Sequence, residues 1–596
     1  MTLPAGWVPV LGGSQLRPGP AAATIGVLIT GGQMPGTTWV WEPPAGAESL
    51  FAPGSPFEIT IEPVLGVECK VFKNRLGNVR EVLTTFTDRH GDLPNLVFPD
   101  ITLTFEDVRA STARVAAWFA ERGVVKGDRI AFASANVATY VIGWWATLVS
   151  GAIVSSLNGW WTPAELLHGV ELSGPRLVLA DGPRMKRLLE AGLPEHVEVH
   201  ELSELESLLG PPRADDPELP DVAIDEDDPA VLLFTSGTTG RPKAACLSHR
   251  NFVHFPSAAT LAGAIGAVLS PPPTVSDAPA RQPSSIMVGP LFHVSGVVPL
   301  ITAHYTGSKL VFPPVGAWSE VTHLQLTEEH AVGGWSAVPT QFWRLLEHPD
   351  FDEYDTSSVT VVGGGGATYS PELLRLMARK LPQARLGVGY GMSETLGSGS
   401  RLGGLTMDEW PASVGTVEAM CELEIRDVDG NVVEDGEVGE ICIRGAVVFL
   451  GYWDNPEASA KALDERRWYR TGDFGRIADG VLYLESRMRD MIIRGGENIY
   501  PIEIEHRLEE HPEVAEVAVV GVPHHQLGQE VAAVVVVKPG ATLDADGVRA
   551  WVGDELARYK IPTHVVFRDV LPYNATGKVL KHELEAELTA GLGAQS

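Results

Sequence analysis

The pattern of apolar and polar positions divides the chain into three stretches. Residues 1–78 are rich in Gly and Pro and show little helical periodicity. Within them, the segment PFEITIEPVLGVECKVF at 56–72 alternates apolar and polar residues, which predicts a short β-hairpin. We assign no function to this N-terminal extension.

From residue 79 to 486, amphipathic helical segments alternate with short apolar segments. The predicted helices span Asn78–His90, Thr104–Arg122 and Ala138–Ser150. The predicted strands are GDRIAFAS (127–134), AIVSSL (152–157), RLVLAD (176–181), VLLFTS (231–236), KLVF (309–312) and SVTVVG (358–363). Strands separated by helices of this length indicate parallel crossover units. The expected fold class is therefore α/β, with a large domain of mostly parallel βαβ sheets.

The pattern changes near Arg487, and we place a domain boundary at 486–490. Beyond it we expect a helix at Glu503–Glu510, strands at 514–522 and 531–537, and a helix at Val548–Tyr559. A single core rarely extends over 596 residues, so a separate small unit is expected on length alone. The predicted layout is an extension at 1–78, a large domain at 79–486 and a small α+β domain at 487–596.

The net charge of the chain excludes some classes of binding partner. Lys and Arg total 45 against 76 Asp and Glu, a net charge of −31. A chain this acidic repels nucleic acid and anionic lipid, because affinity for phosphate backbones comes mainly from Lys and Arg. We therefore expect no nucleic-acid partner, and any polyanion such as ATP must be held by a locally built site. The same negative charge also serves solubility.

The cysteines and the apolar segments indicate the cellular compartment of the protein and whether it crosses a membrane. Cys69, Cys246, Cys421 and Cys442 lie far apart without CxxC spacing, which indicates neither a disulfide framework nor a zinc site and suits a reducing cytoplasm. No basic stretch followed by an apolar core marks a signal peptide. The most apolar run, Val137–Ser156, is broken by glycines and is typical of a buried helix leading into a strand, so no transmembrane segment is expected.

The strongest local signal for chemistry directly follows the apolar strand VLLF. It is the run Thr235, Ser236, Gly237, Thr238, Thr239, Gly240, Arg241, Pro242 and Lys243. Two glycines let backbone N–H groups approach phosphate oxygens, and four hydroxyls and an ammonium add donors for a triphosphate. The run is not a Walker A loop, because Arg-Pro-Lys follows Gly240. The alternative is a flexible surface loop.

A second motif is GYGMSET at 389–395. It combines an aromatic face for a base in Tyr390, close-approach glycines including Gly391, a hydroxyl in Ser393 and one carboxylate for a metal in Glu394. Upstream, VGGGGA at 362–367 could lie flat against a planar ligand or form a plain turn. An isolated Glu is more often a solvated residue than a metal ligand, and only its place within the motif favours the metal.

Three further segments carry candidate groups. In YRTGD at 469–473, the carboxylate of Asp473 can accept from both hydroxyls of a ribose, or form a surface ion pair. In PYNATGK at 572–578, Lys578 could neutralise charge as pyrophosphate leaves, or simply be a solvated tail lysine. In LFHVSG at 291–296, His293 stands beside apolar residues, where a lone histidine is commonly a core residue with its hydrogen bonds satisfied.

Together these motifs resemble the adenylate-forming superfamily of acyl-CoA synthetases, peptide-synthetase adenylation domains and beetle luciferases. The resemblance runs from about residue 80 to 585, in the expected order, and is closest to fatty-acyl or medium-chain acyl-CoA ligases. It implies that the small domain is mobile and rotates between two half-reactions. It also implies Mg²⁺ as cofactor, ATP and coenzyme A as co-substrates, and a small carboxylic acid as substrate. We keep a homodimer open as the assembly.

The resemblance also assigns roles to residues. Tyr390 stacks on adenine, Ser393 contacts phosphate, Glu394 holds Mg²⁺ and Asp473 binds the ribose. Lys578 is the adenylation lysine, and His293 lies near the acyl carbonyl or gates the thiol tunnel. The remaining assignments are Gly365, Gly366 and Ala367 against adenine, Arg487 at ribose and phosphate, Arg489 at the hinge, and Gly495 and Gly496 beside the pantetheine arm.

The chain departs from the family pattern at two positions. The family usually has Thr where this chain has Ser393, which keeps the hydroxyl, and Asp or Lys where it has Arg489. The position of Arg489 in the motif therefore supports its assignment as the hinge residue, whereas its residue type departs from the family pattern. The GGENIYP segment at 495–501 is the version associated with CoA ligases.

The function implied is adenylation of a hydrophobic carboxylic acid, a fatty acid first, followed by transfer to coenzyme A. Alternatives are an acyl-AMP ligase, an enzyme loading a carrier protein, an aryl or alicyclic acid–CoA ligase, a luciferase-type oxygenase and a non-catalytic nucleotide-binding protein. Glycines at 333, 334 and 363–366 with Trp335 and Phe342 suggest a roomy apolar acyl pocket. The same residues could equally be core packing.

Overall fold

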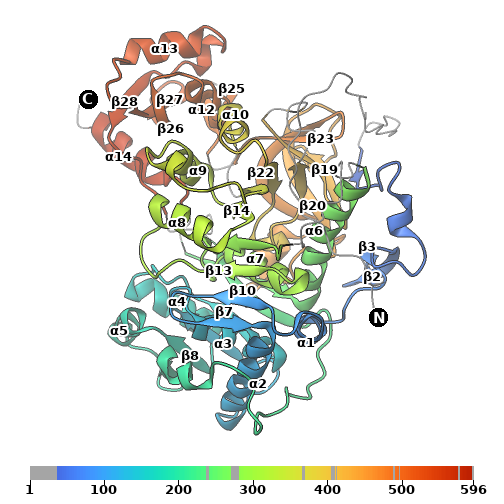
Figure 1. Cartoon of the computed structure of the whole chain (residues 1–596). Coiled ribbons are helices and arrows are strands. Elements are labelled where there is room, and N and C mark those ends of the chain that lie inside the picture. Colours follow the sequence, from blue (N-terminus) through green and yellow to red (C-terminus); the bar gives the residue numbers. More distant parts are fainter. Residues whose placement is uncertain are drawn as a thin grey trace.

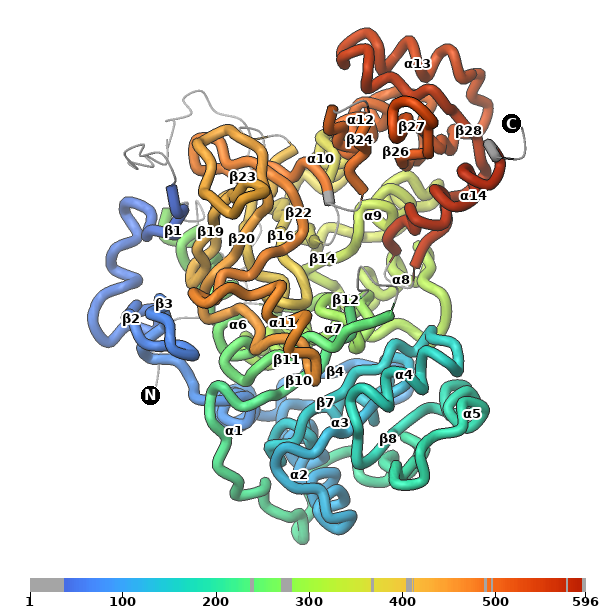
Figure 2. The backbone as a smooth tube through the Cα atoms, turned by 180° about the vertical axis from the view of Figure 1, so that it is seen from behind, coloured from blue at the N-terminus to red at the C-terminus, as the bar shows by residue number. Residues whose placement is uncertain are grey.

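The computed structural model describes residues 37–235, 241–269, 281–365, 369–403, 410, 412–487, 490–494, 497–574 and 577–593. A large body is built around two sheets, and a smaller unit carrying the C-terminus lies at one end of it (Figure 1). We call the described part of residues 490–593 the C-terminal unit. Seen from behind, the same unit lies beside α9 and α10 of the large body (Figure 2).

The first sheet of the large body is mainly parallel and covered on both faces. Its seven strands, in sheet order, are β21 (Gly451–Tyr452), β11 (Lys243–Ser248), β10 (Pro229–Thr235), β7 (Ile153–Ser156), β6 (Arg129–Ala133), β8 (Leu177–Ala180) and β9 (Glu198–Glu201). Strands β10, β7, β6, β8 and β9 pair in parallel, as predicted from the crossover pattern. Alternate residues face opposite clusters: Ile130 and Phe132 pack on one side, and Ala131 and Ala133 on the other.

The second sheet changes character along its length. Its fourteen strands, in sheet order, are β1 (Trp39–Val40), β19 (Cys421–Arg426), β20 (Gly439–Gly445), β22 (Tyr469–Ala478), β23 (Val481–Arg487), β18 (Ser413–Val417), β17 (Ser400–Gly403), β16 (Arg385–Tyr390), β15 (Val361–Gly365), β14 (Gly334–Ser336), β12 (Ser284–Ile286), β13 (Lys309–Val311), β4 (Pro94–Val97) and β5 (Thr102–Thr104). The part from β16 to β4 is parallel, whereas β1 to β17 pair antiparallel. The sequence analysis did not predict this antiparallel part.

Helices cover both sheets of the large body. They are α1 (Val79–His90), α2 (Phe105–Glu121), α3 (Ala138–Val149), α4 (Pro163–Ser173), α5 (Gly182–Ala191), α6 (His249–Leu269), α7 (Val294–Thr306), α8 (Glu320–His330), α9 (Pro339–Leu346), α10 (Pro371–Lys380) and α11 (Pro456–Ala462), with short 3₁₀ turns at Glu48–Phe51, Leu202–Leu208, Phe351–Glu353 and Ser393–Thr395. Asn78 and Thr104 cap α1 and α2 by accepting from backbone N–H groups, which fixes the predicted helix starts.

Helix α6 has features that the sequence analysis did not single out. Among the described residues it is the one helix long and apolar enough to cross a membrane by length and composition. Its first nine residues are buried, and Arg250 there pairs with Glu226 and Asp227. A buried core helix passes the same test of length and apolarity, so this feature is weak evidence for a membrane span.

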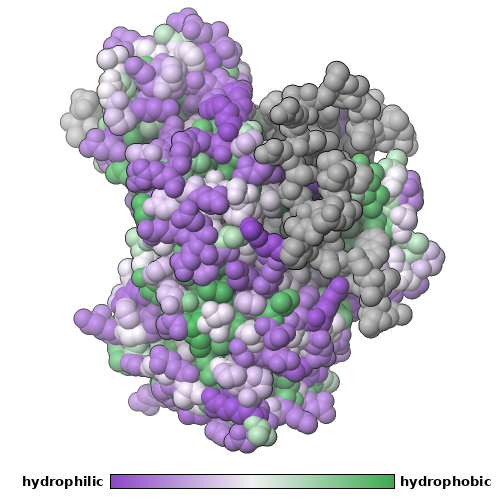
Figure 3. Space-filling model, viewed as in Figure 1, coloured by the Kyte–Doolittle hydropathy of each residue, from purple (hydrophilic) through white to green (hydrophobic). Residues whose placement is uncertain are grey.

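The C-terminal unit has its own core on each face of its sheet. The strands are β25 (Glu497–Ile499), β24 (Ile492–Arg494), β27 (Gly528–Val537), β26 (Val514–His524) and β28 (His564–Arg568), with helices α12 (Pro501–Glu509), α13 (Ala545–Gly553) and α14 (Lys581–Gly593) and a 3₁₀ turn at Arg558–Lys560. Val517 and Val519 face one core cluster, and Ala518 and Val520 the other. Figure 3 shows mainly hydrophilic side chains on the visible face of this unit.

Two predicted boundaries need correction. The last predicted helix ends at Gly553 rather than at Tyr559, because the chain then turns so that Tyr559 and Ile561 pack on the core of the unit. The strand expected at 358–363 lies at Val361–Gly365. The predicted hairpin is confirmed as β2 (Ile59–Val64) paired antiparallel with β3 (Val67–Phe72). The boundary at 487 and the mobility of the small domain stay predictions.

Candidate functional site

The two ends of the predicted phosphate loop are held together by a hairpin. Thr235 at the end of β10 pairs directly with Lys243 at the start of β11. The ammonium of Lys243 lies 4.8 Å from the centroid of the Tyr452 ring, in cation–π contact. Ser236, Gly237, Thr238, Thr239 and Gly240 lie outside the described residues, so their phosphate-binding role stays a prediction.

The carboxylate of Glu394 is the most constrained group of the site. It is 6% exposed, lies on the 3₁₀ turn Ser393–Thr395 and accepts a hydrogen bond from the hydroxyl of Tyr452 at 2.8 Å. Burial raises the pKa of Glu394, hydrogen bonds from Tyr452 and Thr235 oppose that rise, and the negative charge of Asp473 adds to it. A buried carboxylate next to a second negative charge is a position that a cation would stabilise.

This donor set fits Mg²⁺ rather than a metal held by protein alone. Among the residues that the structure describes, no group of three or more His, Cys, Asp or Glu side chains could hold a metal ion. Mg²⁺ usually takes one or two carboxylates and completes its octahedron with phosphate oxygens and water. Glu394 would supply the carboxylate, with the nucleotide supplying phosphate.

Asp473 on β22 and Tyr390 at the end of β16 meet, although three strands separate β22 from β16 in the sheet. The hydroxyl of Tyr390 donates to Oδ2 of Asp473 at 3.1 Å. Asp473 on β22 is the direct strand partner of Arg487 at the end of β23, so the backbone brings these two predicted nucleotide contacts together. Tyr390 is 5% exposed, and its stacking on adenine stays a prediction.

The glycines of the two glycine-containing motifs are required by neighbouring backbone. A Cβ on Gly365 would lie 2.7 Å from the carbonyl oxygen of Gly389, and one on Gly391 would lie 2.2 Å from the carbonyl carbon of Gly397. Close chain packing therefore explains these two glycines without a ligand. Gly366 and Ala367 lie outside the described residues.

His293 begins helix α7 and has a defined tautomer. Its Nδ1 accepts from the backbone N–H of Ser295 at 3.2 Å, so the neutral ring carries its proton on Nε2. Burial, with a smaller contribution from the positive charge of Lys578, lowers the pKa of His293 to about 3. The ring is thus a neutral hydrogen-bond donor.

Lys578 comes to this place from the C-terminal unit. Its charge acts on His293, and the preceding residue contacts the large body, since Oγ1 of Thr340 donates to the carbonyl oxygen of Gly577 at 3.3 Å. The candidate site therefore draws residues from both the large body and the C-terminal unit.

The order and content of these motifs match known sequences. The profile of the AMP-binding enzyme family matches residues 83–453, and that of the AMP-binding enzyme C-terminal domain matches residues 503–578. The chain belongs to the AMP-binding enzyme family. The second match ends at Lys578.

Relatives of this AMP-binding enzyme include CoA ligases of different acids. It is 33% identical to a feruloyl-CoA synthase of Amycolatopsis sp., over 81% of this chain and 93% of the relative. It is 31% identical to a long-chain-fatty-acid–CoA ligase of Mycobacterium tuberculosis, over 82% of this chain and 94% of the relative. Among solved structures it resembles o-succinylbenzoate coenzyme A synthetase from Bacillus subtilis in complex with ATP and magnesium, with a TM-score of 0.71, 28% identity, and coverage of 85% of this chain and 99% of the other.

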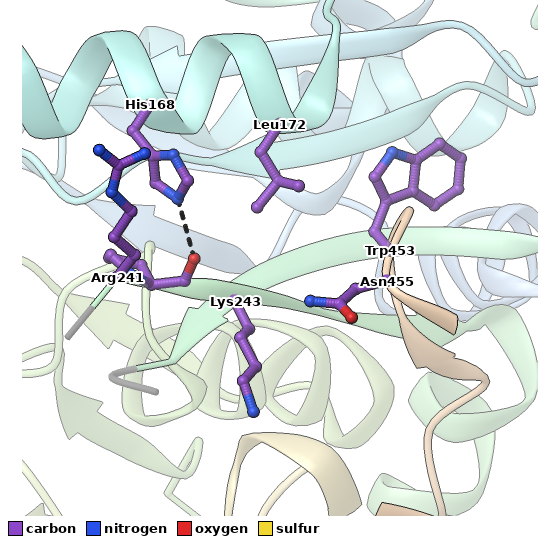
Figure 4. Close-up of a pocket in the computed structure, with 7 residues that line it drawn as sticks. His168, Leu172, Arg241, Lys243, Trp453 and Asn455 are labelled. Carbon is purple, nitrogen blue, oxygen red and sulfur yellow. Dashed lines mark hydrogen bonds between the residues drawn. The ribbon is translucent and has the colours of Figure 1, made fainter. Parts of the chain in front are cut away.

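A pocket beside the predicted phosphate loop of the AMP-binding enzyme is small. It encloses about 130 Å³ between α4 and the start of β11, and its lining comprises His168, Leu172, Arg241, Pro242, Lys243, Trp453 and Asn455. Figure 4 shows His168 hydrogen bonded to the carbonyl oxygen of Pro242, at 3.1 Å, while Lys243 extends away from His168. His168 thus fixes one arm of the hairpin from which Lys243 reaches Tyr452.

Two residues suggested for the acyl pocket lie in the core. Trp335 is 2% exposed and donates from Nε1 to Oγ1 of Thr327, and Phe342 is fully buried in the same cluster. Core packing, the alternative left open by the sequence, is therefore what these two residues do. Arg489, Gly495 and Gly496 lie outside the described residues, as does the side chain of Arg487.

Sequence reasoning missed the partners of Glu394. Tyr452 bonds the carboxylate directly, and Tyr469 hydrogen bonds to Tyr452 from β22. The available signal was an aromatic residue in GYWDNP at 451–456, shortly after the strand ICIRG. That signal is weak, because an aromatic residue after a strand is usually core.

Proposed function

We propose that the protein is an AMP-forming acid–CoA ligase acting on a hydrophobic carboxylic acid. One observation carries the proposal: Gly577, the residue before Lys578, accepts a hydrogen bond from Thr340, so the C-terminal unit brings Lys578 to the large body that holds Glu394 and Asp473. A cation delivered by a separate unit is suited to a step in which negative charge develops and then departs.

In the first half-reaction, an oxygen of the substrate carboxylate attacks the α-phosphorus of ATP. The new P–O bond gives the acyl-adenylate, and the bond to the bridging oxygen breaks to release pyrophosphate. Lys578 stabilises charge on the phosphates as that bond breaks, and Asp473 holds the ribose. Bound at Glu394, Mg²⁺ would supply charge neutralisation at the phosphates.

In the second half-reaction, the thiol of coenzyme A attacks the acyl carbonyl carbon. The thioester forms, AMP leaves and the thiol proton is released. The neutral His293, with its proton on Nε2, is suited to hydrogen bond an acyl oxygen rather than to accept the thiol proton. We assign no general base.

For the substrate we propose a fatty acid first. The likeness to a long-chain-fatty-acid–CoA ligase supports it, at 31% identity over most of both chains. An aryl acid is the second candidate, because the likeness to feruloyl-CoA synthase is equally extensive at 33% identity. Cytoplasmic location is also proposed, since all four cysteines are buried and free. A homodimer stays a prediction.

A pyrophosphate-release screen tests the function. The protein is given ATP, Mg²⁺ and acids of graded chain length and ring content, and active acids are repeated with coenzyme A. We expect acid-dependent pyrophosphate release and formation of the acyl-CoA. Absence of pyrophosphate with every acid would reject ligase activity. Adenylate formation without acyl-CoA would instead favour an acyl-AMP ligase or carrier-protein loading.

A further inference from the structure

Helix α9 has two faces with different neighbours. Phe342, Leu345 and Leu346 are buried in the core of the parallel part of the second sheet. On the other side, the residues that recur at positions i, i+3, i+4 and i+7 are Thr340, Trp343, Arg344 and Glu347. This spacing places the four residues along one stripe of the helix.

The stripe contacts the C-terminal unit from one end of α9 to the other. Thr340 donates to the carbonyl oxygen of Gly577, and Nζ of Lys538 lies 3.5 Å from Oε1 of Glu347 and 6.0 Å from the centroid of the Trp343 ring. The guanidinium of Arg344, by contrast, pairs with Glu320 of α8 at 2.6 Å, within the large body. Both views of the chain show α9 beside β26 and α14 (Figures 1 and 2).

The segment that meets the N-terminal end of α9 is a tight turn ending in Lys578. Gly577 has φ +79° and donates from its N–H to the carbonyl oxygen of Asn574 at 3.0 Å. The backbone N–H of Lys578 donates to Oδ1 of Asn574 at 3.0 Å. A Cβ on Gly577 would lie 2.8 Å from Cγ2 of Val338. Hydrogen bonds with Asn574 therefore hold Gly577 and Lys578, and Gly577 fits closely against the residue preceding α9.

The contacts differ in how much they can contribute to docking. The side chains of Lys538 and Glu347 are 38% and 45% exposed, and an ion pair this exposed adds little. The close fit of the turn against Val338 and the hydrogen bond from Thr340 are therefore the contacts that can fix the position of Lys578.

We propose that Val338, Thr340, Trp343 and Glu347 form the docking surface that holds Lys578 at the site during adenylation. Thr340 is a positioning residue, because it acts through the turn that carries Lys578. The inference rests on the proposed ligase function. It names the surface on which the C-terminal unit docks, and this docking serves the first half-reaction and not the second.

The first test compares the two half-reactions in Thr340→Val, which removes the donor and keeps the side-chain shape. We expect pyrophosphate release to slow about 3- to 10-fold, the loss typical of one neutral hydrogen bond. Transfer of the acyl group from pre-formed acyl-adenylate to coenzyme A should keep the wild-type rate. Arg375→Gln on α10, whose side chain pairs with Glu372 of the same helix, is the matched control and should leave both rates unchanged.

The second test uses rescue. Gly577→Ala should slow pyrophosphate release more than Thr340→Val, because the added Cβ meets Cγ2 of Val338. Val338→Ala removes that atom, so the double variant Gly577→Ala/Val338→Ala should recover at least part of the lost rate. Strain at φ +79° alone would give no rescue, since it is the same in both variants.

The outcomes separate this inference from the proposed function. If the wild-type protein releases no pyrophosphate with any acid, the ligase function fails. If the wild type is active but Thr340→Val slows both half-reactions equally, or Val338→Ala rescues nothing, the docking surface is wrong while the ligase function stands.

Discussion

At the scale of single residues, the site is built from groups whose surroundings decide their charge. Glu394 is buried, and burial raises its pKa, whereas the hydroxyl of Tyr452 at 2.8 Å favours the ionised form. A hydrogen bond to a metal-binding carboxylate fixes the orientation of that carboxylate and also favours its ionised form. Tyr452 is therefore as much a part of the candidate metal site as the carboxylate.

Tyr452→Phe tests this role. The substitution leaves Oε1 of Glu394 without its phenolic donor, so more of the carboxyl is protonated and Mg²⁺ binds more weakly. We expect the Mg²⁺ concentration for half-maximal pyrophosphate release to rise about 10- to 100-fold, as for other partners of metal ligands. Tyr354→Phe, in a different core cluster, is the control. An unchanged Mg²⁺ dependence in Tyr452→Phe would contradict the assignment.

A second residue-scale feature is a set of buried histidines outside the site. Burial lowers the pKa of His254, His304 and His323 to about 3 each. His254 stacks on Phe72 at 5.8 Å, and neither of its ring nitrogens has a hydrogen-bond partner. In the unfolded chain a histidine takes up a proton near pH 6.5. The stability that depends on neutral His254 is therefore complete above about pH 6.5 and is lost as the pH falls towards 3.

His254→Leu should reduce this sensitivity to acid. Between pH 7.5 and 5.0, the wild-type free energy of unfolding should fall about 2 kcal/mol further than that of the variant. Urea unfolding of both proteins at the two pH values measures the difference, with the exposed His196→Leu as control. Equal losses in wild type and His254→Leu would show that His254 is not held neutral in the fold.

At the scale of elements, the sequence predicted correctly those features that depend on neighbouring residues, namely helix starts and helix-separated parallel strands. The helices α1, α2 and α3 begin where Asn78, Thr104 and the apolar run after Val137 indicated, and the parallel strands follow from helix-separated apolar segments. The antiparallel part from β17 to β23 was not predicted. Most of its strands pair with near neighbours in the sequence, as β22 does with β23, but β18 pairs with β23 about 65 residues further along the chain. For Trp335 and Phe342 the sequence left a pocket and the core as equal alternatives, because an apolar residue near glycines has the same local pattern in both, and the structure places both residues in the core.

Candidate site residues could be predicted from the sequence only where they lie within a recognisable motif. Glu394, Asp473 and Lys578 stand in recognisable segments, whereas Tyr452 and Thr340 act through contacts with residues far along the chain. The roles of Gly365 and Gly391 also depended on packing, since the atoms that exclude a side chain belong to other segments.

The contact between α12 and α10 yields a prediction at the same scale. Burial raises the pKa of Glu509 to about 7; the charge of Glu505 adds to the rise, and a hydrogen bond with Ser370 and the charge of Lys581 oppose it. Since Ser370 belongs to the large body, Glu509 lies where the two bodies meet, and burial of its ionised carboxylate there opposes docking despite the hydrogen bond with Ser370. Docking should therefore weaken as the pH rises from about 4.5 to 7, and stay constant above that range.

Glu509→Gln should remove this pH dependence. In the wild type, the ratio of the adenylation rate to the transfer rate should fall between pH 5.5 and 8, by up to about 30-fold. In the variant, which is neutral at every pH, the ratio should be flat. Glu510→Gln, whose side chain faces Arg507, should behave as wild type. A Glu509→Gln profile that follows the wild type would contradict the prediction.

At the scale of the whole molecule, the account requires two bodies that share one site. The large body supplies Glu394, Asp473 and His293, and the C-terminal unit supplies Lys578 through the turn that meets α9. A cation that is needed only for pyrophosphate departure is best placed on a unit that can leave afterwards. The two half-reactions should then respond differently to its loss.

The most direct measurement is the pair of half-reaction rates of Lys578→Ala, with the exposed Lys461→Ala as control. Pyrophosphate release with acid and ATP should fall about 10²- to 10³-fold, as for loss of a single charge-stabilising donor. Acyl transfer from pre-formed acyl-adenylate to coenzyme A should proceed at nearly the wild-type rate. Equal loss of both rates in a folded Lys578→Ala protein would contradict the division of labour between the two bodies.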